Sequence, residues 1–140
     1  MTQTEPGWSL DRIRAHIAEN LPLVGLFSMT IDAATPEGCN LVIDDHPGIF
    51  RPGDMVAGPV LFTAADAGAY GLILAAGGPP EATTIDLTIH FLRPGKGLPL
   101  LARTTPIKLG RRIATTDTII TPMSDPTRQI ARATSTYMIG

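Results

Sequence analysis

The sequence predicts an α+β domain in which one long helix packs against one face of an antiparallel sheet. Three observations lead to this prediction. Residues 59–76 form an apolar segment of helical spacing, and TTIDLTIHFL at 83–92 alternates with the period of a strand. Three further strand-like segments follow, separated by turn residues at the short intervals of a meander.

Length and composition indicate one folded domain spanning residues 1–140. A chain of 140 residues with 44% hydrophobic and 17% charged residues can bury a core, which argues against disorder. Cys39 is the only cysteine, so no intrachain disulfide can form. The N-terminal sequence shows no basic start followed by an apolar run, and we therefore expect a cytoplasmic protein.

The charge is small overall but unevenly distributed. A net charge of −2 gives no general attraction to nucleic acid or to anionic membranes, and neither is expected as a partner. Residues 1–90 carry 3 basic and 11 acidic side chains, whereas residues 91–140 carry 8 basic and 2 acidic ones. An anionic ligand should therefore meet the C-terminal third, unless these charges are only solvated strand faces.

The first elements predicted are a short helix and two strands. Ser9 is a suitable N-cap for an amphipathic helix over 10–20, within an N-terminal segment, residues 1–22, that packs on the domain. Strands are expected at 23–34 and 39–45, joined by the turn Thr35-Pro36-Glu37-Gly38. A loop rich in glycine and proline follows over 46–57.

The central helix is the most informative segment. Pro59 suits a first helical position, and Gly77-Gly78-Pro79-Pro80 ends the helix after about 18 residues, or roughly 27 Å. Gly68 and Gly71 each cost about 1 kcal/mol relative to alanine in a helix, so we expect close approach of neighbouring elements around them. Asp66 is the only charged residue here, and it argues against a membrane span because a carboxylate at mid-membrane costs roughly 2.5–3.5 kcal/mol.

Four strands are expected after this helix, at 83–92, 98–109, 112–123 and 127–139. Strict alternation in the first of them predicts two faces. One face would carry apolar side chains, and the other would carry Thr84, Asp86, Thr88 and His90.

Several motifs resemble one family. AGPVLFTAADAGAYG at 57–71 resembles the family segment HGG-x6-D-x-A, and TTIDLTIHFLRPGKG at 83–97 resembles its next strand. KLGRRIATTDTIITPMSDPTRQIARATSTYMI at 108–139 resembles its closing hairpins. Together these are similar to PaaI-like acyl-CoA thioesterases over residues 50–139. The resemblance implies a hotdog fold, in which a curled antiparallel sheet of about six strands wraps one long helix.

The resemblance also implies site residues. Asp66 would act as general base or nucleophile in hydrolysis of an acyl-CoA thioester, the Gly58 N–H would polarise the carbonyl, and Thr84 would position water. Coenzyme A phosphates would meet the basic residues near a Gly-Arg turn, Lys108, Arg111 and Arg112. Coenzyme A enters only as part of the substrate, with no other cofactor. No metal is expected, because the three histidines show no ligand spacing.

A shared site between two chains is expected from distance. Asp66 lies about 10 Å along the helix from Pro59, so one helix cannot easily bring Gly58 and its own Asp66 to one carbonyl. An antiparallel second copy could, which favours a homodimer with shared active sites, as the family has, and further assembly to a homotetramer.

Three alternatives stay open. Ala57 and Pro59 replace the His and second Gly of the family motif, and Arg51 stands where a polar residue, often Asn, is found. These departures favour a catalytically weak protein that binds acyl-CoA without turnover. A hydratase would need an Asp–His pair, for which Asp45-His46 is a poor match. Asp66 could also be a structural carboxylate bonded to strand N–H groups or threonine hydroxyls.

Overall fold

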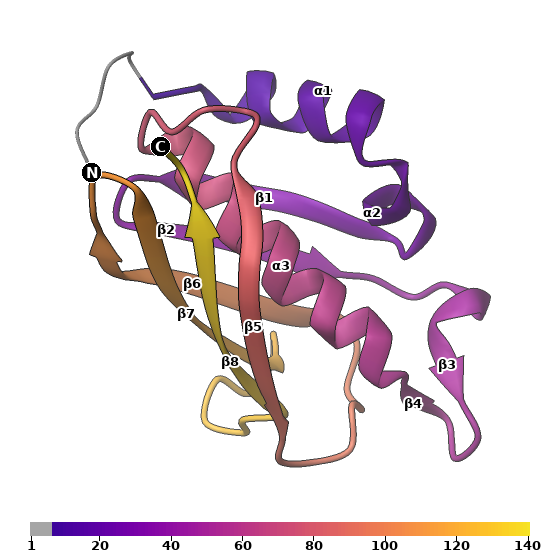
Figure 1. The fold of residues 1–140 in the computed structure, drawn as a ribbon. Coiled ribbons are helices and arrows are strands. Elements are labelled where there is room, and N and C mark those ends of the chain that lie inside the picture. The colour runs from indigo at the N-terminus through magenta and orange to yellow at the C-terminus, as the bar shows by residue number, and fades with distance from the viewer. Residues whose placement is uncertain (1–6) are drawn as a thin grey trace.

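The computed structural model describes residues 7–140, which form one curled sheet around a long helix (Figure 1). The helices and strands follow one another in the order α1 (Leu10–Asn20), α2 (Pro22–Leu26), β1 (Met29–Thr35), β2 (Gly38–Ile43), β3 (Phe50–Arg51), β4 (Met55–Val56), α3 (Gly58–Ala75), β5 (Thr83–Phe91), β6 (Leu100–Leu109), β7 (Ile113–Pro122) and β8 (Ala131–Met138).

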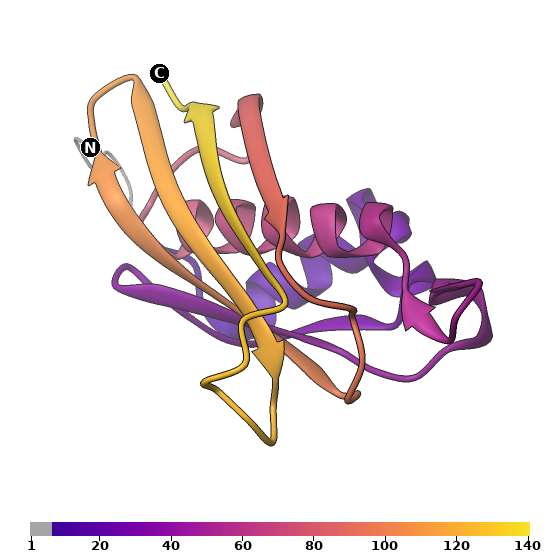
Figure 2. The same cartoon turned by 90° about the horizontal axis from the view of Figure 1, so that it is seen from below.

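The main sheet has six strands in the order β1-β2-β6-β7-β8-β5, and every neighbouring pair is antiparallel. The sheet twists so that β1 and β2 run nearly along α3, whereas β5, β7 and β8 are steeply inclined to it, as the view from below shows (Figure 2). Within the described residues β5 pairs only with β8, so one of its edges is free. The predicted α+β class and the six-stranded antiparallel sheet are confirmed.

Helix α3 forms the centre of the core. It begins one residue before the predicted start, because Gly58 already has helical geometry and Pro59 follows in the first turn. The helix is long and apolar enough to cross a membrane, but 72% of it is buried inside the protein, which is typical of a core helix.

Two glycines let the sheet come close to α3, as predicted. A Cβ at Gly68 would stand 2.6 Å from the Thr104 hydroxyl oxygen, and one at Gly71 would stand 2.8 Å from the Ile31 side chain. Both distances are shorter than van der Waals contact, so a side chain at either position would force the facing Thr104 or Ile31 side chain to move.

The N-terminal segment is helical for longer than predicted. Helix α1 has the predicted bounds, and the Ser9 side chain accepts a hydrogen bond from the Arg12 N–H. The expected strand over 23–34 is wrong in its first part, where Pro22 opens the short helix α2. Ser28 then adopts a φ of 57°, and the strand begins only at Met29. The fixed φ of proline at a first helical position explains the extra turn.

The segment predicted as a loop over 46–57 contains more regular structure. It holds a 3-10 turn, Pro47–Ile49, and the two-residue strands β3 and β4 form a small hairpin outside the main sheet. Strand β2 begins one residue earlier and ends two residues earlier than predicted. Strands β5 to β8 lie within the predicted ranges and are shorter by one to four residues at an end.

Candidate active site

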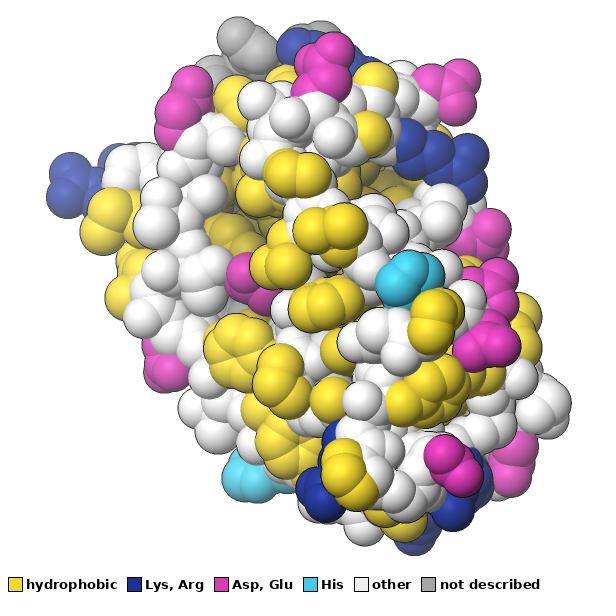
Figure 3. Space-filling view, turned by 90° about the vertical axis from the view of Figure 1, so that its right-hand side faces the viewer, with side chains coloured by type: hydrophobic (Ala, Val, Ile, Leu, Met, Phe, Trp, Pro, Cys, Tyr) yellow, Lys and Arg dark blue, Asp and Glu magenta, His cyan; other side chains and the backbone are white. Residues whose placement is uncertain are grey.

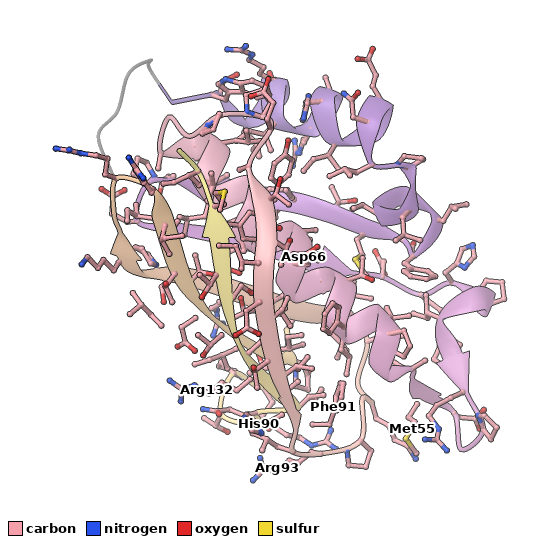
Figure 4. All side chains as sticks on the ribbon, in the orientation of Figure 1. Met55, Asp66, His90, Phe91, Arg93 and Arg132 are labelled. Carbon is pink, nitrogen blue, oxygen red and sulfur yellow. The ribbon has the colours of Figure 1, made fainter. Side chains whose placement is uncertain are left out.

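Asp66 lies midway along α3, on the side of the helix next to β5 (Figure 4). Its carboxylate Oδ1 accepts two hydrogen bonds. The Thr84 hydroxyl donates at 2.7 Å and the Tyr137 hydroxyl donates at 2.6 Å. The Tyr137 oxygen also lies 2.9 Å from the Asp66 backbone carbonyl. These partners satisfy a partly buried charge that would otherwise be costly in an apolar helix.

A β-bulge explains how Thr84 reaches Asp66. The pairing of β5 with β8 shifts between Thr84 and Asp86, so Thr84 pairs with Tyr137 and Leu87 pairs with Ser135. Tyr137 and Ser135 are both buried on the helix side of the sheet. Thr84 therefore shares a face with Leu87, and the prediction that it lies on the opposite, polar face is wrong. Strict alternation fails here because a bulge adds one residue to the strand.

Tyr137 is the site residue that the sequence analysis missed. It lies on β8 and is 3% exposed. Burial first, and then the nearby Asp66 charge, raise the pKa of its phenol well above 10.0, so the hydroxyl stays protonated as a donor. One signal was present in the sequence: the inward positions of β8 are small apart from this tyrosine, with the order Ala131, Ala133, Ser135, Tyr137.

Asp66, Thr84 and Tyr137 line a cavity of about 310 Å³. The rest of its wall is largely apolar and comes from α2, α3 and the segment that leads into β5. These lining residues are Leu21, Leu23, Val24, Thr63, Ala67, Tyr70, Pro80, Ala82 and Thr83. The cavity thus places one carboxylate beside a largely hydrophobic space, which is the arrangement expected of a small-molecule site.

Tyr70 forms a fixed part of this wall. Its hydroxyl donates to the Pro80 carbonyl oxygen at 2.7 Å. Since the single phenolic hydrogen is used there, the contact of 2.8 Å with His16 Nε2 has His16 as donor. The Tyr70 ring also stacks on Tyr137, with centroids 6.4 Å apart. Helix α1 is therefore tied to the cavity wall through His16.

Gly58 lies eight residues before Asp66 on the same helix, or about 12 Å along its axis. Its N–H donates to no residue in the described part of the chain. Gly58 borders a second hollow of about 460 Å³ together with Pro59, Phe62, Thr63, Ile89 and Phe91. Thr63 borders both hollows, so they adjoin along α3. A single chain does not bring Gly58 to Asp66.

Lys108, Arg111 and Arg112 lie together at the turn between β6 and β7 (Figure 1). They line a hollow of about 520 Å³, to which no acidic side chain of residues 7–140 contributes. This hollow shares no lining residue with the Asp66 cavity. The three basic residues therefore lie together, but apart from Asp66 of their own chain.

Other candidates for chemistry do not converge on the cavity. Within residues 7–140 no group of three or more His, Cys, Asp or Glu side chains could hold a metal ion. Burial raises the pKa of the Cys39 thiol to about 12, which makes it a poor nucleophile. Asp45 and His46 are exposed, and His46 Nδ1 accepts the Gly48 N–H as a cap of the 3-10 turn. Neither lines the cavity around Asp66.

The profile of the thioesterase superfamily matches residues 53–124. This range contains α3 and strands β5, β6 and β7. The chain belongs to the thioesterase superfamily. This thioesterase-superfamily chain is 30% identical to a protein of Silicibacter sp. TM1040 described as a candidate thioesterase. The alignment covers 99% of this chain and 96% of the other, with a TM-score of 0.84. The family supports thioester hydrolysis as the reaction.

Two more distant solved structures confirm the hotdog fold of this thioesterase-superfamily chain. A thioesterase of Haemophilus influenzae is 18% identical, with 99% and 94% of the two chains covered and a TM-score of 0.80. Zebra fish thioesterase superfamily member 2 is 16% identical, with 96% and 100% covered and a TM-score of 0.81. Among curated proteins, no sequence matches this chain.

Proposed function

We propose that this protein is an acyl-CoA thioesterase in which the Asp66 carboxylate is the general base or the nucleophile. The observation that carries the proposal is the geometry around Asp66. Two hydroxyls hold one of its oxygens at 2.7 and 2.6 Å, beside a largely apolar cavity of about 310 Å³. A structural carboxylate would need the same partners, but it would not need to border a cavity.

Asp66 can bring about hydrolysis of the thioester by two routes. As a base, the carboxylate takes a proton from water while the water oxygen bonds to the thioester carbon, and the proton then passes to the departing thiolate as the C–S bond breaks. As a nucleophile, the carboxylate bonds to that carbon and expels the thiolate, and water then hydrolyses the resulting anhydride. Both routes give a carboxylic acid and free coenzyme A. The Thr84 hydroxyl uses its only hydrogen on Asp66, so it can position water only as an acceptor.

The carbonyl oxygen needs a donor as it gains negative charge, and we assign this role to Gly58 of a second copy of the chain. Its N–H has no partner in the described residues and lies at the N-terminus of an 18-residue helix, where the helix dipole favours negative charge. Within one chain Gly58 and Asp66 are about 12 Å apart along the axis. An antiparallel neighbour would bring each Gly58 toward the other chain's Asp66.

The surface around Gly58 supports such a homodimer. Hydrophobic side chains form a band down the face that holds α2, β3, β4 and the start of α3 (Figure 3). Phe62 and Phe91, which flank Gly58 in its hollow, are 41% and 54% exposed. The free edge of β5 adjoins them and could pair with its copy. Further assembly to a homotetramer is part of the same proposal.

The cavity is the proposed place of the acyl group. An apolar cavity of about 150 Å³ suffices to bind benzene, and this cavity has about 310 Å³. An aromatic or medium-length acyl chain would therefore fit along Tyr70 and the apolar side chains of α2. The coenzyme A phosphates would lie against Lys108, Arg111 and Arg112, whose hollow is lined by no acidic side chain from the described part of the chain.

Mixed dimers test the shared site directly. Gly58→Pro removes the proposed donor, and the extended backbone of Ala57, with ψ of 146°, accepts a following proline. Asp66→Asn removes the proposed base. Each variant alone should release almost no thiol from acyl-CoA. After the two are unfolded together and refolded, half of the dimers are mixed and each has one intact site, so about one quarter of the parent activity should return.

Gly58→Ala, which keeps the N–H, is the matched control and should remain active. Complementation that fails although mixed dimers form would refute the shared site. A parent protein that releases no thiol from a panel of short, aromatic and long acyl-CoAs would refute the thioesterase itself.

Acyl-CoA binding without hydrolysis is the second candidate function, because Ala57 and Pro59 differ from the family motif. A protein that only binds acyl-CoA would show saturable binding by calorimetry and no thiol release. Both functions are compatible with the proposed cytoplasmic location, where acyl-CoA substrates would be met.

A further inference from the structure

The two hydroxyl donors fix the orientation of the Asp66 carboxylate. Both of their hydrogen bonds end on Oδ1. Oδ2 accepts no hydrogen bond from the described residues, and it is not one of their buried unpaired polar atoms. Asp66 also lines the cavity, so Oδ2 is the oxygen left open to it. Turning the carboxylate away would break two charge-assisted bonds.

We propose that Tyr137 is a positioning residue that, together with Thr84, holds Oδ1 so that Oδ2 alone meets water or the thioester carbon. The role rests on the proposed thioesterase function, and it adds the reacting atom and the residue that selects it. Tyr137 borders the cavity, but its hydroxyl hydrogen is used on Asp66, so it acts on the reaction through that carboxylate.

The surroundings of Tyr137 suit such a role. Its strand is paired on both sides, with Thr84 of β5 and with Ala114 of β7. Its ring stacks on Tyr70 at an interplanar angle of 21°, and Tyr70 is held in turn by Pro80 and His16. A donor with so little freedom of movement can impose a single carboxylate orientation, which is what a preorganised site requires.

The test compares kcat with KM for Tyr137→Phe. The kcat should fall about tenfold because the carboxylate is no longer held in place, with KM changed less than twofold. Incorporation of 3-fluorotyrosine at position 137, which keeps the hydrogen-bond donor, should leave kcat near the parent value.

Ser135→Ala is the matched control. Ser135 lies on the same strand and face two residues earlier, is buried, and has a hydroxyl without a partner in the described residues. Its kcat and KM should match those of the parent. An unchanged kcat in Tyr137→Phe would overturn the role of Tyr137.

Carbon-13 NMR separates this inference from the proposed function. The Asp66 carboxyl resonance can be recorded at one fixed pH with or without turnover, and its chemical shift should change in Tyr137→Phe but not in Ser135→Ala. If the parent releases no thiol but the resonance moves in Tyr137→Phe, the thioesterase proposal fails and the hydrogen bond is real. If the parent is active and the resonance does not move, the inference fails and the thioesterase stands.

Discussion

Replacing Asp66 by asparagine isolates its chemistry from its contribution to the fold. The asparagine Oδ1 can accept from the same two hydroxyls that now donate at 2.7 and 2.6 Å. Its amide nitrogen takes the place of Oδ2, on the side that is open to the cavity. The substitution therefore leaves no buried donor without a partner, which is the usual source of a large loss of stability.

The expected magnitudes differ for stability and for rate. Hydrogen bonds to a neutral acceptor are weaker than those to a charged one by about 1 kcal/mol each, and the relief of a partly buried charge offsets this loss. Unfolding free energy should therefore change by less than about 2 kcal/mol, or a few degrees in Tm. An amide can neither accept the proton nor attack the carbonyl, so kcat should fall at least about a hundredfold.

The measurements are release of free thiol from a panel of acyl-CoAs and thermal unfolding by circular dichroism. Asp66→Ala should lose kcat to the same extent. It should be somewhat less stable than Asp66→Asn, because the Tyr137 hydroxyl keeps the carbonyl of residue 66 as acceptor at 2.9 Å but the Thr84 hydroxyl loses its acceptor. Asp86→Asn, which neutralises an exposed carboxylate on the same strand as Thr84, is the control and should keep the parent rate. Hydrolysis by Asp66→Asn at the parent rate would refute the reasoning.

Further predictions concern the core, the thiol and the binding surfaces. Gly68→Ala, whose Cβ would stand 2.6 Å from a buried hydroxyl, should destabilise the fold by about 1–2 kcal/mol in urea unfolding, whereas Gly25→Ala, with open space around it, should not. Cys39 should resist alkylation at pH 8. Because its folded pKa of about 12 exceeds the ordinary 9.0, its contribution to stability is full below pH 9 and is lost between pH 9 and 12. Ala82→Phe should narrow the cavity and lower kcat/KM for aromatic acyl-CoAs more than for acetyl-CoA. Arg112→Glu should raise KM with little change in kcat.

The sequence determined the elements whose signals are local. Helix α3 could be read from Pro59 at its start and the glycine-proline segment at its end, and the alternation of 83–92 gave a strand. Asp66 stood out because one charge in an apolar helix needs a partner. The family resemblance added a role for it, and the matched superfamily profile supports the reaction class.

Only the tertiary structure decided what surrounds Asp66. The bulge in β5 turns Thr84 toward the helix, and pairing across the sheet brings Tyr137, 71 positions along the chain, onto the same oxygen. Neither effect has a local signature, because a bulge depends on how two strands register and a hydrogen bond between α3 and β8 depends on how the sheet curls. The sequence thus identified the acid, and the fold selected its partners and the oxygen that is left free.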